Sequence, residues 1–186
     1  NLAPVFMGGG LLLLVVLLLV SFGKKDEADS QAASVESPDA QSSYSVTPSE
    51  VNYPAPELAL ENVDGKTESL EDYRDKVVLV NNWATWCPPC KAEIPTLEEY
   101  YKAHSAEGFV IIGIEAGEPQ PEVSSFVKGA GITYPSWIDL KNASLRAFGT
   151  GGLPNSFVID REGTVRLAWV GEINRAMLEE YVTPII

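Results

Sequence analysis

The chain has 186 residues, and its 26 acidic side chains outnumber its 13 Lys and Arg, which gives a formal net charge of −13. A surface that neutralises phosphates needs clustered Lys and Arg, so we expect no nucleic-acid partner. The cysteines number two, Cys87 and Cys90, and the single histidine is His104. This set excludes a scaffold stapled by several disulfides and falls short of the four ligands of a structural zinc site within one chain, so no metal is expected.

An uncharged apolar run at residues 2–22 opens the chain. About 20 apolar residues suffice for a helix to cross a bilayer, so residues 1–23 are predicted to form a transmembrane signal anchor in contact with lipid. The alternative is a cleavable signal peptide whose apolar core is Leu11–Val20. The long run and the weak cleavage signal favour the anchor.

Residues 24–52 are rich in Ser, Ala, Asp, Glu and Pro and poor in large apolar residues. Such a segment buries too little apolar surface to offset chain entropy, so it is predicted to be a disordered linker spanning about 30 Å. Lys24 and Lys25 lie directly after the apolar run, where the positive-inside rule alone does not favour export. The predicted extracytoplasmic location therefore depends on the domain at residues 53–186.

The first predicted elements of this domain form a β-hairpin, from two short extended runs at residues 57–63 and 66–70. Asp64-Gly65 between them favours a type I′ turn, which needs positive φ. Residues 69–73 are predicted to form a single helical turn. Residues 76–83 are a continuous apolar run ended by polar residues, which is typical of a buried central strand.

A helix is predicted from Cys87 to about His104, because Pro88 and Pro89 suit a first helical turn and Pro95 is expected only to kink it. The order of the remaining elements predicts an α/β domain with a mixed sheet and helices on both faces. These elements are a strand at 109–115, a helix at 121–128, a strand at 134–138, a helix at 140–148, a hairpin of strands at 155–160 and 165–170, and a helix at 173–185.

Cys87 and Cys90 lie where the central strand gives way to the helix. Unpaired N–H groups and the helix dipole stabilise a thiolate there and lower its pKa. We therefore expect Cys87 to be exposed and nucleophilic and Cys90 to be buried and resolving, with both sulfurs on one helix face and close enough to bond. The alternative, two inert core thiols, fits poorly with the flanking prolines. A redox-active Cys87–Cys90 disulfide needs no further cofactor.

The residues between the cysteines bear on the direction of electron flow. Neither Pro88 nor Pro89 can donate an N–H to the Cys87 thiolate, so the reduced form is less stabilised. A less stabilised thiolate gives a less oxidising centre, which favours a reductant over an oxidase.

Two segments resemble the TlpA/ResA-like branch of the thioredoxin superfamily, which carries redoxin or AhpC/TSA-type domains. They are APELALENVDGKTESLEDYRDKVVLVNNWATWCPPCKAEIP (Ala55 to Pro95) and GLPNSFVIDREG (Gly152 to Gly163). The resemblance implies a thioredoxin-like mixed central sheet flanked by helices, with the β-hairpin as an N-terminal extension. It also implies a membrane-anchored reductase of cysteine-containing proteins, for example in cytochrome c maturation, that takes electrons from a membrane thiol donor.

The resemblance implies roles for individual residues as well. Pro154 matches the family's cis-proline, and the backbone of Leu153 would pair with a bound substrate. Glu93 matches an acidic residue that exchanges a proton with Cys90, although a solvated helix glutamate is the alternative. Trp83 and Trp86 are expected around the disulfide, with core packing as the alternative. The remaining expected substrate contacts, beside Trp86, are Pro88 and Pro89.

Two residues differ from those of the related proteins, and three other functions remain as alternatives. Asn81 stands where thioredoxin has a buried aspartate, which makes Glu93 the better proton acceptor, and Asn155 follows the proline where Thr is commoner. A peroxidase of the peroxiredoxin type is one rival, but its Pro-x-x-x-Thr-x-x-Cys motif does not fit the residues before Cys87. A disulfide oxidase or isomerase is the second, and a non-catalytic module that binds through the Leu153–Pro154 groove is the third.

Overall fold

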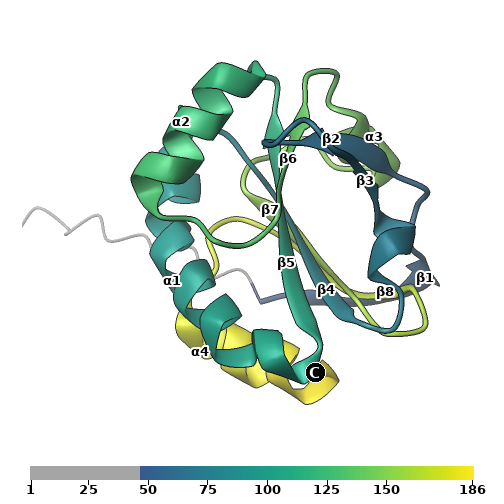
Figure 1. Cartoon of the computed structure of the whole chain (residues 1–186). Helices are drawn as coiled ribbons and strands as arrows, with labels where there is room; N and C mark the ends of the chain where they lie inside the picture. The colour runs from purple at the N-terminus through teal and green to yellow at the C-terminus, as the bar shows by residue number, and fades with distance from the viewer. Residues whose placement is uncertain (1–46) are drawn as a thin grey trace, which may run out of the picture. The chain divides into compact units, whose positions relative to one another are not determined.

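The computed structural model describes residues 47–186, and these form one mixed sheet with helices packed on it (Figure 1). The strands are β1 Ser49–Pro54, β2 Ala59–Asn62, β3 Thr67–Ser69, β4 Val77–Trp83, β5 Phe109–Ala116, β6 Ser136–Asp139, β7 Asn155–Ile159 and β8 Thr164–Val170. The helices are α1 Pro88–His104, α2 Gln120–Ala130, α3 Ala143–Ala147 and α4 Arg175–Met177, joined by short turns of other helix types.

The eight strands lie in the order β1-β8-β7-β4-β5-β6-β2-β3. The three central strands β4, β5 and β6 run parallel, and every other pair is antiparallel. Every residue of β4 and β5 is buried, as the continuous apolar runs predict for central strands. The carboxyl ends of these parallel strands therefore meet at one edge of the sheet, and α1 begins there.

Two apolar cores lie on opposite faces of the sheet. Along β4, Val77 and Leu79 contribute to a core shared with α1, α2 and α4, whereas Val78 and Val80 contribute to a core on the other face with Phe148, next to α3. Figure 1 shows α1, α2 and α4 together on one side of the sheet. Helices on both faces are thus confirmed, and the alternation of side chains along a strand explains how one strand supplies both cores.

The β2–β3 hairpin is confirmed, but its turn differs from the expected type. Only Gly65, and not Asp64, has a positive φ, which is 79°. The side-chain oxygen of Asn62 accepts hydrogen bonds from the backbone N–H groups of Asp64 at 3.0 Å and Lys66 at 2.9 Å. Because Asn62 satisfies both amides, the turn needs a single left-handed residue rather than the two of a type I′ turn.

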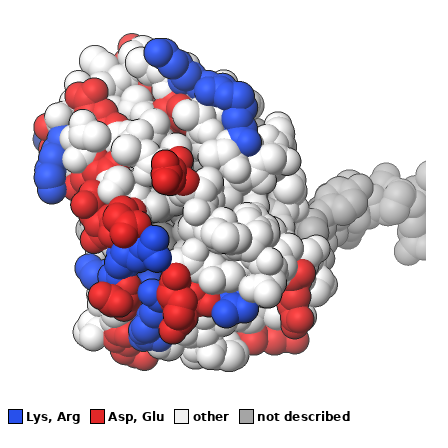
Figure 2. Space-filling view, turned by 90° about the vertical axis from the view of Figure 1, so that its right-hand side faces the viewer, with Lys and Arg blue, Asp and Glu red and all other residues white. Residues whose placement is uncertain are grey.

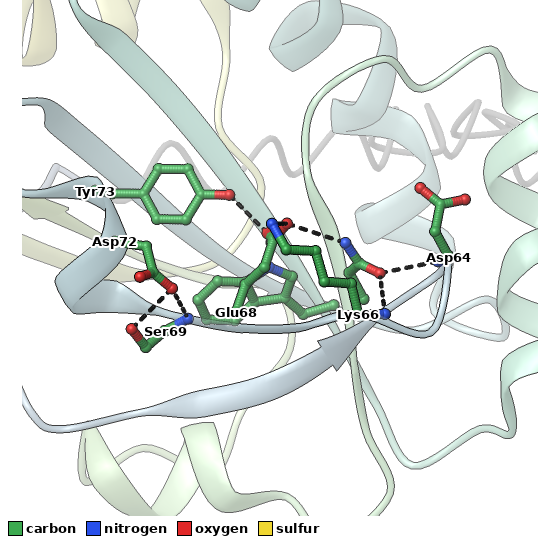
Figure 3. Close-up of polar contacts among 8 residues, drawn as sticks. Asp64, Lys66, Glu68, Ser69, Asp72 and Tyr73 are labelled. Atoms are coloured by element: carbon green, nitrogen blue, oxygen red, sulfur yellow. Dashed lines mark hydrogen bonds and ion pairs between the residues drawn. The ribbon is translucent and has the colours of Figure 1, made fainter.

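A half-buried carboxylate on β3 ties this hairpin to the rest of the sheet (Figure 3). Glu68 accepts hydrogen bonds from the Tyr73 hydroxyl at 2.7 Å, the Trp137 indole N–H at 3.0 Å and the Asn62 amide at 3.1 Å. Burial alone would raise the pKa of Glu68, but these hydrogen bonds and the charge of Lys66 hold it below its ordinary value. The ionised carboxylate therefore helps to fix the hairpin against β6.

The predicted helical turn is confirmed as the 3₁₀ turn Leu70–Tyr73. Its capping box is visible in Figure 3, where the carboxylate of Asp72 accepts from the backbone N–H of Ser69 at 2.8 Å and from its hydroxyl at 3.0 Å. Such a box satisfies donors that the start of a helical turn leaves unpaired.

Strand β1 extends the domain beyond its predicted boundary. It pairs with β8 from Ser49 onward, so residues 49–52, which the composition assigned to the linker, belong to the folded domain. Its residues alternate only between exposed and half-buried, as expected of an edge strand. Such a strand buries little apolar surface, so its composition does not distinguish it from a linker.

Two helices are shorter or less regular than predicted. In α3 the preceding Asn142 has a left-handed φ of 52°, which prevents the helix from starting at residue 140. The last helix is not continuous from residue 173, because Asn174 caps α4 by accepting from the Met177 N–H at 3.0 Å. It then continues as a π turn, Leu178–Val182, and a 3₁₀ turn, Thr183–Ile185.

Charged side chains on the surface form short-range pairs. Arg74 lies 2.9 Å from Glu71, and Arg175 lies 2.6 Å from Glu179 one helical turn away. Figure 2 shows one face of the molecule, on which Lys and Arg intermingle with Asp and Glu at one side and a broad area lacks charge. Exposed pairs of this kind contribute at most about 1 kcal/mol each, so they bear on solubility more than on the fold.

The predicted membrane anchor and most of the predicted linker lie outside the described residues. Within residues 47–186, none of the helices combines the length and the apolar character needed to cross a bilayer.

Candidate active site

Cys87 and Cys90 form a disulfide at the junction of β4 and α1. Cys87 is the N-cap of α1, and Pro88 and Pro89 occupy its first turn, as predicted. The Cα atoms of the two cysteines are 5.3 Å apart. The backbone N–H of Cys90 donates to Sγ of Cys87 at 3.3 Å. Because neither proline has an N–H, the amide of Cys90 is the first one in the helix that can stabilise charge on Cys87.

The expected exposure of Cys87 is wrong for this disulfide form. Cys87 is only 4% exposed and Cys90 is fully buried, and both belong to the core on the α1 face of the sheet. The exposed groups are instead the flanking Trp86, at 65%, and the two prolines. The disulfide therefore lies inside an apolar rim that the residues on either side of Cys87 provide.

The loop before β7 lies at the same edge of the sheet. Asn82 of β4 pairs with Asn155 of β7, so Pro154 lies next to the end of β4, from which the cysteine loop leaves. The Leu153–Pro154 peptide bond is cis, as the family resemblance implied. Leu153 is half-buried and packs against the core that contains both cysteines.

Glu93 is completely buried, so the alternative of a solvated helix glutamate is wrong. It lies on α1 one turn after Cys90, and its two oxygens accept hydrogen bonds from the Asn81 amide at 2.7 Å and the Ile173 N–H at 2.9 Å. Burial raises the pKa of Glu93 to about 8, although the two hydrogen bonds oppose the rise. A carboxyl group with such a pKa can take up or release a proton near neutral pH.

The two tryptophans of the motif have different environments. Trp83 is 1% exposed, belongs to the same core as the cysteines and packs against Phe126, with ring centroids 5.1 Å apart. Trp86 does not join this core and presents its ring to solvent. Trp83 therefore supports the disulfide from inside, whereas Trp86 is available to a partner.

Sequence reasoning missed two features of the Leu153–Pro154 loop. Val170, at the end of β8, is 46% exposed, and a Cβ at Gly152 would lie 2.9 Å from its side chain. Asn155 is fully buried, accepts from the Asn82 amide at 2.8 Å and donates to the carbonyl of Gly152. Strand pairing brings these residues together, and the only signal in the sequence was the unusual Asn155.

The chain is similar over most of its described part to known thiol–disulfide proteins. Residues 51–168, which include both cysteines and Pro154, match the AhpC/TSA family. The thiol-disulfide oxidoreductase ResA of Geobacillus thermodenitrificans is 35% identical over 131 residues, 70% of this chain and 75% of the relative. ResA of Bacillus subtilis is 34% identical over 128 residues, 69% of this chain and 72% of the relative.

A solved structure supports the same relationship. A thiol:disulfide interchange protein of the thioredoxin family from Chlorobium tepidum TLS superposes with a TM-score of 0.66 at 36% sequence identity. The match covers 74% of this chain and 98% of the Chlorobium chain.

Proposed function

This chain belongs to the AhpC/TSA family as a thiol–disulfide oxidoreductase, and we propose that it reduces disulfides in cysteine-containing proteins at the extracytoplasmic face of a membrane. The observation that carries the proposal is the Cys87–Cys90 disulfide at the N-terminus of α1, with the buried Glu93 one turn further. This arrangement combines a stabilised nucleophile, a resolving thiol and a proton acceptor.

In the proposed reaction the Cys87 thiolate attacks one sulfur of the substrate disulfide. A mixed disulfide forms, and the other substrate sulfur leaves as a thiolate that takes a proton. Cys90 then loses its proton to the ionised form of Glu93 and attacks Sγ of Cys87, which releases the second substrate thiolate and restores the Cys87–Cys90 disulfide. Glu93 passes the proton on to the released thiolate, which resets it for the next turnover. Two electrons pass from the dithiol to the substrate, and a thiol donor must return them.

The surroundings of the disulfide suit a protein substrate. Trp86, Leu153 and Val170 offer apolar contacts around it, with the exposed Pro88 and Pro89. A substrate segment would lie in extended form along Leu153, next to the cis-proline, which places its cysteine over Cys87. Aromatic anchors of this kind contribute much of the binding energy at protein interfaces.

The proposal also includes a direction of electron flow, from the protein to its substrates, and a location at the membrane. The two prolines leave Cys90 as the first amide donor to the Cys87 sulfur, which favours a reducing centre. A membrane thiol protein would then supply the electrons, and cytochrome c maturation is one process that needs such a reductase. The apolar run at residues 2–22 would anchor the chain to the bilayer.

Cysteine variants test the reaction. In Cys87→Ser the dithiothreitol-driven reduction of insulin should fall to the uncatalysed rate. Reduced Cys90→Ser, freed of dithiothreitol and mixed with insulin, should instead accumulate a mixed disulfide between Cys87 and the substrate, visible on a non-reducing gel. If Cys87→Ser and Cys90→Ser each retained full insulin reduction, the assignment of the redox centre would be wrong. Peptide binding without any turnover in the wild type would instead favour the non-catalytic module.

A further inference from the structure

A single carboxylate of a neighbouring loop holds the loop that leads into Cys87 in place. Glu118, between β5 and α2, accepts from Thr85 through both of its oxygens. The backbone N–H of Thr85 lies 3.0 Å from Oε2, and its hydroxyl lies 2.7 Å from Oε1. Thr85 immediately precedes Trp86 and stands two residues before Cys87. The position of Glu118 therefore bears directly on the segment that carries the exposed Trp86.

A second carboxyl group holds Glu118 in turn. Glu115 lies near the end of β5 and is completely buried. Its Oε2 accepts from the backbone N–H of Glu118 at 2.9 Å, which makes the two acidic residues direct neighbours. Within residues 47–186 no donor reaches the other oxygen, Oε1, so this atom is free to carry a proton.

We propose that Glu118 is a positioning residue for the active-site loop, which it clamps through Thr85, and that buried Glu115 locks Glu118 in place by accepting its backbone N–H. Glu115, Glu118 and Thr85 are called the carboxyl clamp below. The clamp is defined by geometry alone, and only its effect on turnover rests on the proposed function.

The charges around Glu115 determine how the clamp responds to pH. Burial raises the pKa of Glu115 to about 8, and the hydrogen bond to Glu118 and the negative charges of Glu118 and Asp139 add to the rise. Asp139 comes from β6. Glu93 of α1 lies on the face of the sheet to which Glu115 belongs, because it is hydrogen-bonded to Asn81 of the neighbouring strand β4. Burial would raise the pKa of Glu118 too, but the hydrogen bonds from Glu115 and Thr85 keep it below its ordinary value.

The proton of the pair therefore resides on Glu115 below about pH 8. Above that pH both carboxyls are charged, and the two adjacent negative charges repel each other, with the charge on Glu115 buried away from water. Glu118 then loses a donor and acquires a repelling neighbour. The clamp should loosen, and the Thr85–Trp86 segment should become more mobile, as the pH rises through about 8.

The first test uses the full oxidised chain in detergent, in which the disulfide removes thiol titration. The backbone amide proton shift of Thr85 is followed by NMR between pH 6 and pH 10. A titration with its midpoint near pH 8 is expected in the wild type and in Glu93→Gln, which controls for the other buried acid. The titration should vanish in Glu115→Gln, whose amide still donates to Glu118. A titration that survives Glu115→Gln would overturn the clamp.

The second test concerns substrate docking in the reduced protein at pH 7. Thr85→Val keeps the shape and the backbone N–H but removes the hydroxyl donor. A hydrogen bond to a charged group is worth enough to predict a rise of about tenfold in KM for a protein disulfide, with kcat changed less. Thr85→Ser restores the donor and should restore KM. An unchanged KM in Thr85→Val, with the variant folded, contradicts the positioning role.

A matched control separates the clamp from general surface charge. Glu122 is exposed and, with Thr85 and Glu118, lines the same shallow cavity, yet it does not bond the loop in the described structure. Glu122→Gln should leave both the Thr85 titration and KM unchanged. If Glu122→Gln raised KM as much as Thr85→Val, the cavity would act through its charge and the clamp would be wrong. Loss of turnover in the wild type with a normal Thr85 titration would refute the proposed function and leave the clamp intact.

Discussion

Replacing Glu93 with glutamine removes a buried proton-binding group while keeping nearly the same shape. The folded-state pKa of Glu93, about 8, lies above its ordinary value of 4.5. A raised pKa means that the folded state binds the proton more tightly than the unfolded state. The contribution of this group to stability is therefore fully present below about pH 4.5 and is lost as the pH rises through about 8.

The magnitude follows from the same two values. Between pH 4.5 and about 8 the folded state holds one proton that the unfolded state has released, so stability falls by about 1.4 kcal/mol per pH unit. The full loss amounts to about 5 kcal/mol. Glutamine does not titrate, but it offers one acceptor where Asn81 and Ile173 supply two donors. One donor left unsatisfied should cost about 1–3 kcal/mol at every pH.

Urea unfolding of the oxidised protein between pH 4.5 and pH 9.5 measures both effects. Below pH 5 the wild type should be the more stable protein by about 1–3 kcal/mol. The Glu93→Gln curve should be flatter, so the two curves should cross before pH 9. Glu115→Gln serves as the comparison, because it removes a different buried acid whose pKa is also about 8. Curves for the wild type and Glu93→Gln that stay parallel would refute a raised pKa at Glu93.

Three further substitutions test other parts of the structure. Glu68→Gln should lower the free energy of unfolding by roughly 1–2 kcal/mol at pH 7. Because the pKa of Glu68 is lowered, this loss should shrink as the pH falls below the ordinary value of 4.5 and the wild type takes up the proton; a loss that does not shrink with falling pH would contradict this. Gly113→Ala should destabilise by about 1–3 kcal/mol in thermal unfolding, because a Cβ there would lie 2.9 Å from the Tyr134 ring, whereas Gly129→Ala, with open space around it, should not. Val170→Asp should raise KM for a protein disulfide about tenfold without lowering stability, since Val170 is 46% exposed beside Gly152; an unchanged KM would exclude Val170 from the docking surface.

Local signals in the sequence predicted the elements that frame the disulfide. The apolar run of β4 and the two prolines after Cys87 fixed a strand followed by a helix, and the structure has both at those residues. Strand β1 gave no comparable signal, because an edge strand buries few side chains. The turn after Asn62 was assigned to the wrong type because the decisive contact is a side chain bonding its neighbouring amides.

The environment of the site depends on contacts between distant parts of the chain. Glu93 is buried because Asn81 and Ile173, from β4 and the segment before α4, close over it. Thr85 meets Glu118 across the ends of β4 and β5, and no motif marks that contact. Cys87 looked exposed from its place at a helix start, yet the sheet edge and the core around it reduce its exposure to 4%. The residue types in the sequence therefore identified the redox chemistry, whereas the raised pKa of Glu93 depends on tertiary packing.

The reduction potential of the Cys87–Cys90 disulfide tests the proposed reductase most directly. The full chain is equilibrated in dithiothreitol and glutathione buffers, and the fraction of disulfide is quantified by thiol alkylation. A potential near or below that of thioredoxin, about −270 mV, is the predicted result. A potential near −120 mV would mark an oxidase and contradict the proposed direction of electron flow.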